Sequence, residues 1–160
     1  MPTNLYGPGD NYHSKNSHVL ASLIRKFYEA SKRSLPTVNC WGTGTPMREF
    51  LHVDDLAEAI LFCLLNWDPD GSNAPLDKNG NPLYLLNIGS GIEISIKDLA
   101  NKIRNITNYQ GDIIWDHSKP DGTPRKLLNS SKIKNLGWKP SIDLDIGIKK
   151  TLDSFINQLD

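Results

Sequence analysis

The chain has 160 residues, of which 38% are hydrophobic and 22% are charged, which is enough for one ordinary domain and too few for two of typical size. Its 18 basic residues balance its 18 acidic ones, so composition gives no electrostatic argument for a nucleic-acid or membrane-surface partner. No apolar run approaches the roughly 18 residues of a membrane-spanning helix. The opening residues have neither the basic start nor the apolar stretch of a signal peptide. We therefore expect a cytoplasmic protein that binds neither nucleic acid nor membrane.

Hydrophobic periodicity and turn residues divide the chain into alternating helices and short strands. Residues 6–17 are dense in turn formers and predict a loop, after which Ser17 has the chemistry of a helix N-cap. Residues 67–82 are almost entirely turn chemistry and predict a mobile surface excursion. The predicted elements are a helix over 19–31, strands over 37–41 and 48–53, a helix capped by Asp54 or Asp55 that runs to 66, a strand over 83–88, a helix over 95–105 capped by Ser95, a strand over 112–116, a short helix over 130–136 closed by Gly137, and an amphipathic helix over 143–159. This alternation favours an α/β or α+β class.

Two glycine turns and the metal-ligating residue types are the candidate cofactor sites in the sequence. The turn Gly89-Ser-Gly91 lies between a predicted strand and a predicted helix, but Ile94 stands where a dinucleotide-binding turn needs its third glycine. The turn Gly42-Thr-Gly44 leads into a strand, so it cannot present a helix N-terminus to a pyrophosphate. The four histidines and two cysteines show no metal-ligand spacing, and we expect no metal site. The cysteines, Cys40 and Cys63, stand in apolar surroundings, which favours reduced, buried thiols over a disulfide.

Four segments carry a resemblance to a known family: residues 1–8 with 16–18, residues 41–55, residues 87–91 and residues 118–126. The run Arg-Glu-Phe-Leu-His-Val-Asp-Asp and the turn Asn-Ile-Gly-Ser-Gly resemble the extended short-chain dehydrogenases/reductases, which include the nucleotide-sugar epimerases and dehydratases. The segments Pro-Thr-Asn-Leu-Tyr-Gly-Pro and Ser-Lys-Pro-Asp-Gly-Thr-Pro-Arg-Lys are narrower. They resemble the branch of this family that inverts C3 and C5 and reduces C4 of GDP-4-keto-6-deoxymannose. The resemblance covers nearly all of the chain apart from the 67–82 excursion.

The resemblance implies an α/β fold that is the C-terminal part of a Rossmann-type enzyme. Residues 1–160 would form mainly the small mixed α/β substrate-binding domain, with the end of the cofactor loop at residues 1–8 and most of the parallel dinucleotide-binding sheet absent. Family members also carry a glycine-rich turn, a catalytic Ser and a Tyr-x-x-x-Lys pair. Only Tyr28 and Lys32 match that pair here, and they follow the Pro-Thr-Asn-Leu segment, whereas the family's pair precedes it. The resemblance therefore implies an NADP-dependent homodimer in the intact enzyme and no activity in the isolated chain.

The matched positions imply a proton-transfer group and a cofactor contact. His18 matches the histidine that gives and takes protons during epimerisation, a task suited to imidazole near neutral pH. The alternative is a helix-start histidine bonded to a turn carbonyl. The resemblance also places the cofactor against His18 and a short loop along its nicotinamide end. That loop consists of Pro2, Thr3, Asn4 and Leu5.

Four further positions match substrate contacts in the family: Lys26, Trp41, Arg48 and Asp121. Arg48 suits a diphosphate because guanidinium binds phosphate oxygens in pairs, and Lys26 adds a point charge. Trp41 offers a flat apolar surface, and Asp121 can accept hydrogen bonds from hydroxyl or base N–H groups. The alternatives are a solvated Lys26, a core Trp41, an Arg48 paired with Glu49 or Asp54, and a turn-forming Asp121.

Two rival functions stay open from the sequence alone. The first is a different nucleotide-sugar epimerase or dehydratase, and the second is a nucleotide-sugar-binding module without catalysis. We also expect the predicted strand over 48–53 and the apolar face of residues 19–28 to pack against a missing half and to remain exposed in this chain.

Overall fold

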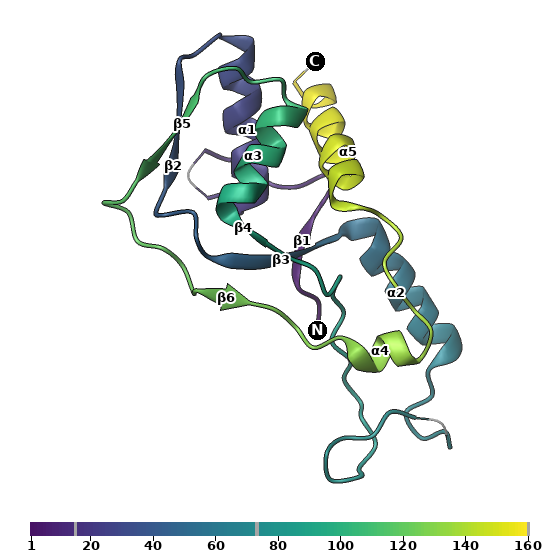
Figure 1. The fold of residues 1–160 in the computed structure, drawn as a ribbon. Helices are drawn as coiled ribbons and strands as arrows, with labels where there is room; N and C mark the ends of the chain where they lie inside the picture. Colours follow the sequence, from purple (N-terminus) through teal and green to yellow (C-terminus); the bar gives the residue numbers. More distant parts are fainter. Residues whose placement is uncertain (15, 73, 160) are drawn as a thin grey trace.

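A computed structural model describes residues 1–14, 16–72 and 74–159, and its helices lie in a larger and a smaller group with strands between them (Figure 1). The helices are α1 (Val19–Lys32), α2 (Val53–Asn66), α3 (Ile96–Ile106), α4 (Ser131–Asn135) and α5 (Leu144–Asn157). The strands are β1 (Asn4–Tyr6), β2 (Thr37–Trp41), β3 (Met47–His52), β4 (Glu93–Ser95), β5 (Asp112–Asp116) and β6 (Arg125–Lys126). No helix among the described residues is long and apolar enough to cross a membrane.

Strand β3 joins three distant parts of the chain. Its second half pairs in parallel with β1, so that Leu5 lies opposite Leu51. Its first half pairs antiparallel with β4 and parallel with β6, and Arg48 therefore lies between Ile94 and Lys126. A separate parallel pair is formed by β2 and β5. The segments that carry the family resemblance thus converge on β3.

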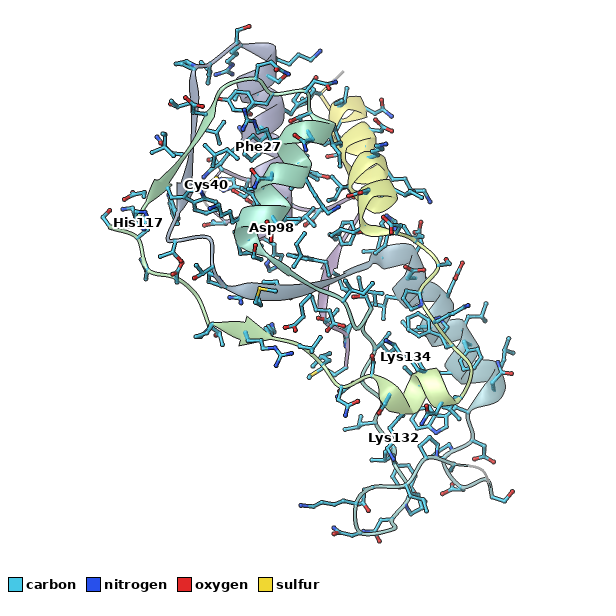
Figure 2. The ribbon with its side chains drawn as sticks, viewed as in Figure 1. Phe27, Cys40, Asp98, His117, Lys132 and Lys134 are labelled. Carbon is cyan, nitrogen blue, oxygen red and sulfur yellow. The ribbon has the colours of Figure 1, made fainter. Side chains whose placement is uncertain are left out.

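The larger core lies between α1, α3, α5 and the β2–β5 pair. The buried face of α1 includes Leu20, Ile24 and Phe27, of which the last is labelled in Figure 2. Ile103 of α3 and Ile148 of α5 are also fully buried in this cluster. The expectation that the face of residues 19–28 stays exposed is therefore wrong, because this chain's own helices cover it. Burying each such side chain contributes roughly 1.5–3 kcal/mol, so this face stabilises the chain itself.

The smaller core lies under α2 and α4 and includes the segment predicted as a strand over 83–88. Leu51, Ile88 and Trp138 are buried there, so strand β3 is also covered within the chain, against expectation. Residues 83–88 form no strand; Ile88 makes one isolated parallel bridge, to Pro2. The physical reason is that the segment beside Ile88, residues 1–3, is short. Ile88 N donates to Met1 O at 2.8 Å and Thr3 N donates to Ile88 O at 3.0 Å, and the two segments then separate.

The helix caps confirm some predictions and correct others. The hydroxyl of Ser95 caps α3, as predicted. Helix α1 has His18 rather than Ser17 at its N-cap position, and α2 has His52 rather than Asp54 or Asp55. The Nδ1 atom of His52 accepts a hydrogen bond from the Asp54 amide at 3.2 Å. An imidazole nitrogen that accepts here fills the role usually taken by a Ser, Thr, Asp or Asn oxygen.

Residues 67–72 and 74–82 form turns, as predicted, and their mobility stays a prediction. Asp77 organises one turn by accepting from the amides of Asn79 and Asn81, and these bonds lower the pKa of its carboxyl. Both cysteines are unpaired; Cys40 is buried and Cys63 is half-buried. Burial raises the pKa of both thiols.

Candidate functional site

A cavity of about 450 Å³ lies between the start of the chain, the start of α1 and strand β3. Five of the predicted site residues line it: Thr3, Asn4, Leu5, His18 and Arg48. Its remaining wall comes from the turn over residues 6–10 and from apolar side chains of α1, β3 and α2. The cavity thus brings the predicted cofactor loop, the predicted acid and the predicted diphosphate ligand into one space.

The loop that enters this cavity is fixed by its own polar side chains. The Thr3 hydroxyl donates to the backbone carbonyl of Glu49 at 3.3 Å, and Asn4 Nδ2 donates to the same carbonyl at 2.7 Å. These two bonds hold the loop against β3. Both are donated by side chains of the loop and neither by its backbone amides. Pro2 is placed elsewhere: it pairs with Ile88 and does not line the cavity.

The turn over residues 6–10 approaches the start of α2 closely. Gly7 has a φ of 153°, and a Cβ atom there would lie 2.4 Å from Val53 Cγ2, so a side chain cannot be accommodated. Asp10 was not predicted as a site residue, yet it lines the cavity. Its Oδ1 accepts from the Asn11 amide at 2.7 Å, and its buried Oδ2 has no hydrogen-bond partner among the described residues.

The His18 imidazole is exposed at the beginning of α1 and makes no side-chain capping bond with the helix. His18 thus occupies the helix-start position of the alternative, while no hydrogen bond from its ring to a turn carbonyl is found among the described residues. A ring that is not needed to hold the helix and that faces a cavity can exchange protons with a bound molecule.

The Arg48 side chain is half-buried in the cavity wall. Its Nη1 donates to the carbonyl of Met47 at 2.7 Å, and among the described residues it has no ion-pair partner. The alternative pairing with Glu49 or Asp54 is wrong, because Glu49 accepts from backbone amides and Asp54 lies beside His52. A guanidinium without a carboxylate beside it keeps its donors for an anion such as a diphosphate.

Two smaller hollows adjoin the cavity along shared walls. Trp41, Arg48 and Asp121 line one of about 190 Å³, and Lys26 and Trp41 line another of about 250 Å³. Val19 borders all three spaces. The structure therefore places each of the four predicted substrate residues along one connected surface.

Trp41 lies between two lysines and is 65% exposed, so its alternative role as a core aromatic is wrong. The Nζ atoms of Lys26 and Lys119 lie 5.7 Å and 5.8 Å from the ring centroid, within the range of cation–π attraction. Lys26 Nζ also donates to Asn39 O at 3.0 Å, which fixes its side chain. Sequence reasoning missed Lys119 because no pattern links it to Trp41. An exposed aromatic surface flanked by positive charge suits a phosphorylated nucleoside.

Asp121 holds the neighbouring turn in place. Its carboxylate accepts from the Thr43 amide at 2.9 Å and from the Thr43 hydroxyl at 2.6 Å. These hydrogen bonds lower the pKa of the Asp121 carboxyl. Gly42, with φ of 77°, passes so close that a Cβ atom there would meet Asp121 Oδ1 at 2.2 Å. Asp121 therefore acts as a turn-forming residue and lines the hollow as well.

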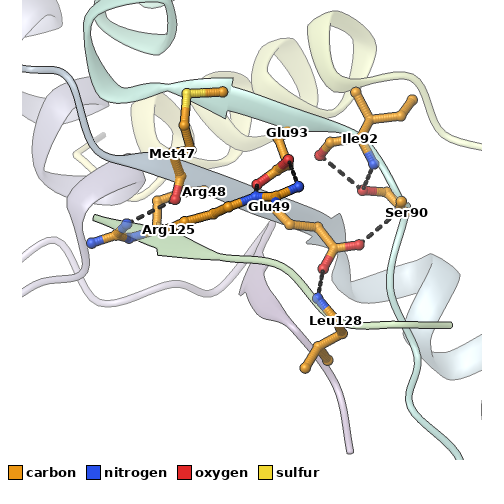
Figure 3. Close-up of polar contacts among 9 residues, drawn as sticks. Met47, Arg48, Glu49, Ser90, Ile92, Glu93, Arg125 and Leu128 are labelled. Atoms are coloured by element: carbon orange, nitrogen blue, oxygen red, sulfur yellow. Dashed lines mark hydrogen bonds and ion pairs between the residues drawn. The ribbon is translucent and has the colours of Figure 1, made fainter. Parts of the chain in front are cut away.

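Glu49 is a fully buried carboxylate that sequence reasoning missed as part of the site's framework. Its Oε1 accepts from the Gly91 amide at 2.6 Å and its Oε2 from the Leu128 amide at 3.1 Å (Figure 3). A Cβ atom at Gly89 would lie 2.4 Å from Oε1, so only glycine fits there. The Gly89-Ser-Gly91 turn thus encloses a carboxylate of this chain, which agrees with the prediction that it is not a phosphate-binding turn. The position of Glu49 in the run Arg-Glu-Phe-Leu-His, where a charged residue stands inside a predicted strand, was the feature of the sequence that could have indicated this role.

Comparison with known proteins shows which family and which folds the chain is similar to. The profile described as the NAD dependent epimerase/dehydratase family matches residues 1–75. The mixed α/β fold matches Rossmann-type enzymes: a GDP-L-fucose synthetase from Naegleria fowleri has a TM-score of 0.82 at 28% identity, with 99% of this chain and 45% of that chain covered. A GDP-6-OMe-4-keto-L-xylo-heptose reductase from C. jejuni gives 0.80 at 32% identity, with 98% and 53% covered. Residues 1–75 are therefore similar to the NAD dependent epimerase/dehydratase family, and the predicted fold class is confirmed.

Within that family the chain is similar to GDP-L-fucose synthases. It is 47% identical over 159 residues to the probable GDP-L-fucose synthase 1 of Oryza sativa subsp. japonica, covering 99% of this chain and 44% of that protein. It is 44% identical over 161 residues to the GDP-L-fucose synthase of Escherichia coli (strain K12), covering 100% of this chain and 49% of that protein. The chain therefore spans about half the length of the curated relatives it matches.

Proposed function

We propose that this chain supplies the substrate-binding portion of an NADP-dependent enzyme that converts GDP-4-keto-6-deoxymannose into GDP-L-fucose. The observation that carries the proposal is the cavity shared by His18, Arg48 and the residue 3–5 loop. The similarity to proteins named GDP-L-fucose synthases supports the same substrate. We expect the enzyme to act in the cytoplasm as a homodimer.

In this proposal each predicted residue has a task in the reaction. A base from the remaining part of the enzyme takes a proton from C3 and from C5 next to the 4-keto group, and the His18 imidazolium gives a proton to each carbon on the opposite face. Arg48 binds the diphosphate, and the Lys26 charge strengthens that binding. Trp41 packs against the nucleotide or sugar. Asp121 holds the turn beside Trp41 and accepts hydrogen bonds from the substrate.

The residue 2–5 loop fits one end of a dinucleotide. Thr3, Asn4 and Leu5 line an open cavity, and the loop is fixed by bonds from its side chains. Pro2 contributes by setting the direction of the loop rather than by contact, and His18 borders the same space. NADPH, when bound there, would supply the hydride that reduces C4. The solved Naegleria fowleri GDP-L-fucose synthetase bound to NADP supports the choice of this cofactor.

A chimera tests the proposed function. In it, this chain replaces the part of the Escherichia coli GDP-L-fucose synthase with which it aligns. We expect the chimera to convert GDP-4-keto-6-deoxymannose and NADPH into GDP-L-fucose, identified by chromatography and mass spectrometry. Arg48→Lys, which keeps the charge and loses the paired donors, should raise KM about tenfold or more with a smaller change in kcat. A product reduced at C4 with C3 and C5 uninverted would overturn the epimerase part of the proposal.

A further inference from the structure

Glu49 of β3 is a fully buried carboxylate held by backbone donors alone. Its side chain accepts from the amides of Gly91 and Leu128 (Figure 3). In the part of the chain that the structure describes, no lysine or arginine forms an ion pair with it. Taking a carboxylate out of water is costly even when hydrogen bonds replace its hydration, so we looked for what these two bonds achieve in the site.

The Leu128 amide follows directly on an exposed segment that borders the candidate site. Residues 117–127, which we call the arm, are all exposed, so burial of apolar surface contributes little to their position. Gly122 of the arm lies against Arg48, because a Cβ atom built there would be 2.9 Å from Arg48 Nη2. The position of the arm therefore decides which groups surround the Arg48 guanidinium.

Polar contacts hold the arm at both ends. Near its start, Asp121 binds the turn that follows β2. Near its end, β6 pairs with β3 over only two residues, and the Leu128 amide then donates to Glu49 Oε2 at 3.1 Å. The ion pair of Arg125 with Glu93 adds little, because the Arg125 side chain is 65% exposed. Glu49 is therefore the buried anchor for the end of the arm.

The backbone of Glu49 holds a different part of the site. The Thr3 hydroxyl and Asn4 Nδ2 both donate to its carbonyl, so the predicted cofactor loop depends on a group that the carboxylate does not share. One residue thus joins the loop and the arm through separate atoms. A change confined to the Glu49 side chain should disturb the arm and leave the loop in place.

We propose that Glu49 is a positioning residue for the substrate, whose carboxylate fixes the arm against Arg48 so that the guanidinium and the arm meet a diphosphate in one arrangement. This inference rests on the proposed function. Glu49 does not line the cavity or the two adjoining hollows, so it has no contact with a molecule bound there. Its effect on binding is transmitted by the arm.

Glu49→Gln tests the proposal in this chain. The variant keeps the shape of the side chain and turns one acceptor into an NH₂ group that faces a backbone N–H. Asp55→Asn is the matched control, because Asp55 is equally buried and also accepts from two backbone amides, those of Ser141 and Ile142, away from the candidate site. Both variants lose the same kind of bonds, but only Glu49→Gln loses them at the arm.

Two measurements distinguish the variants. The first is the Kd for GDP, by isothermal titration calorimetry, and the second is hydrogen exchange over residues 124–128, by mass spectrometry. We expect Glu49→Gln to weaken GDP binding about tenfold and to speed exchange of this segment, while Asp55→Asn changes neither. In the chimera, Glu49→Gln should raise the KM for GDP-4-keto-6-deoxymannose and leave the KM for NADPH unchanged, since the bonds to the Glu49 carbonyl remain.

An unchanged Kd for GDP in Glu49→Gln would overturn the proposal, and so would an equal rise in Asp55→Asn, which would report a general loss of stability. If Glu49→Gln does not fold, Gly89→Ala replaces it with the same expectation, because a Cβ atom there would displace the carboxylate without removing it. If the unsubstituted chain does not bind GDP, that result counts against the proposed function, and hydrogen exchange decides the role of Glu49. Faster exchange over residues 124–128 would then support the anchor, and unchanged exchange would overturn it.

Discussion

Arg48 and Glu49 are adjacent residues of β3 and have different roles in the candidate site. The Glu49 carboxylate is fully buried and holds two backbone amides from distant turns, so it shapes the site. Arg48 is half-buried in the cavity wall with its donors only partly used. Successive side chains of a strand point to opposite faces, which explains why Glu49 binds the surrounding turns while Arg48 lines the cavity.

His18 should matter for epimerisation far more than for reduction. In the chimera, His18→Asn removes the proposed proton donor, and losing a positioned general acid typically costs about 10²–10⁴ in rate. The measurement is deuterium incorporation at C3 and C5 from D₂O, read by mass spectrometry together with product identity. The variant should incorporate less deuterium and yield a C4-reduced, uninverted sugar. Incorporation at the unsubstituted rate would remove His18 from the proposed mechanism.

His52 should make the stability of the chain depend on pH. Burial lowers the pKa of its imidazole below the usual 6.5, an effect that Lys150 reinforces and that Asp54 and Asp55 oppose. Its Nδ1 accepts the Asp54 amide, so the neutral ring carries its proton on Nε2, and a second proton would break the cap. As pH falls below 6.5, the His52 imidazole takes up its second proton in the unfolded chain before it does so in the folded chain. The free energy of unfolding should therefore fall as pH drops below 6.5, and the contribution of His52 should be fully present above 6.5.

Urea unfolding between pH 5 and 7.5 measures this dependence. His52→Asn keeps an acceptor at the N-cap without a titrating ring and should flatten the profile. His117→Asn, at an exposed position, is the control and should leave the slope unchanged. An unaltered slope in His52→Asn would show that another group causes the dependence.

At the scale of elements, adjacent carboxylates at the start of α2 have different roles. Asp55 is buried and accepts from the Ser141 amide at 2.8 Å and the Ile142 amide at 3.2 Å, which ties α2 to the segment before α5. Asp54 has a side chain that is 60% exposed. Asp55→Asn should cost about 1.5–3 kcal/mol of unfolding free energy, because its amide group would face backbone N–H donors. Asp54→Asn should change it by less than about 0.5 kcal/mol. Equal effects in urea unfolding would contradict this assignment.

Elements with strong helical periodicity were predictable, since α1, α3 and α5 each bury one face in the core. Features that depend on distant partners were not. Residues 83–88 have the apolar run of a strand, but only Ile88 pairs with another segment, because residues 1–3 lie beside that residue alone. The cap at His52 was missed because cap preferences point to Asp, while the burial of Asp55 depends on Ser141, 86 residues away.

Those residues of the candidate site that lie in family motifs were predictable from the sequence. The loop over residues 3–5, His18 and Arg48 were found through family motifs, and the fold brings them to one cavity. Asp10, Glu49 and Lys119 were missed, because their significance appears only when β3, Trp41 and the turns around them are assembled. Sequence patterns report the face a residue occupies on its own element and do not report which distant group meets it.

At the scale of the whole molecule, the chain brings together the proposed substrate-binding residues, and its described residues contain no dinucleotide-binding turn. Gly89-Ser-Gly91 is occupied by Glu49, and Gly42-Thr-Gly44 by Asp121. Binding groups without the means to hold and orient a cofactor do not catalyse hydride transfer. We therefore expect this chain to contribute substrate-binding groups, and the half of the relatives' length that it does not span to contribute the dinucleotide-binding turn.

The rate of NADPH oxidation with GDP-4-keto-6-deoxymannose measures whether this chain needs a second half for hydride transfer. It is followed by the absorbance of the reduced cofactor in the isolated chain and in the chimera, at equal concentrations. We expect no oxidation above background by the isolated chain and steady, substrate-dependent oxidation by the chimera. Steady oxidation by the isolated chain would show that it needs no second half, and a folded chimera that binds NADPH and does not oxidise it with this substrate would overturn the proposed function.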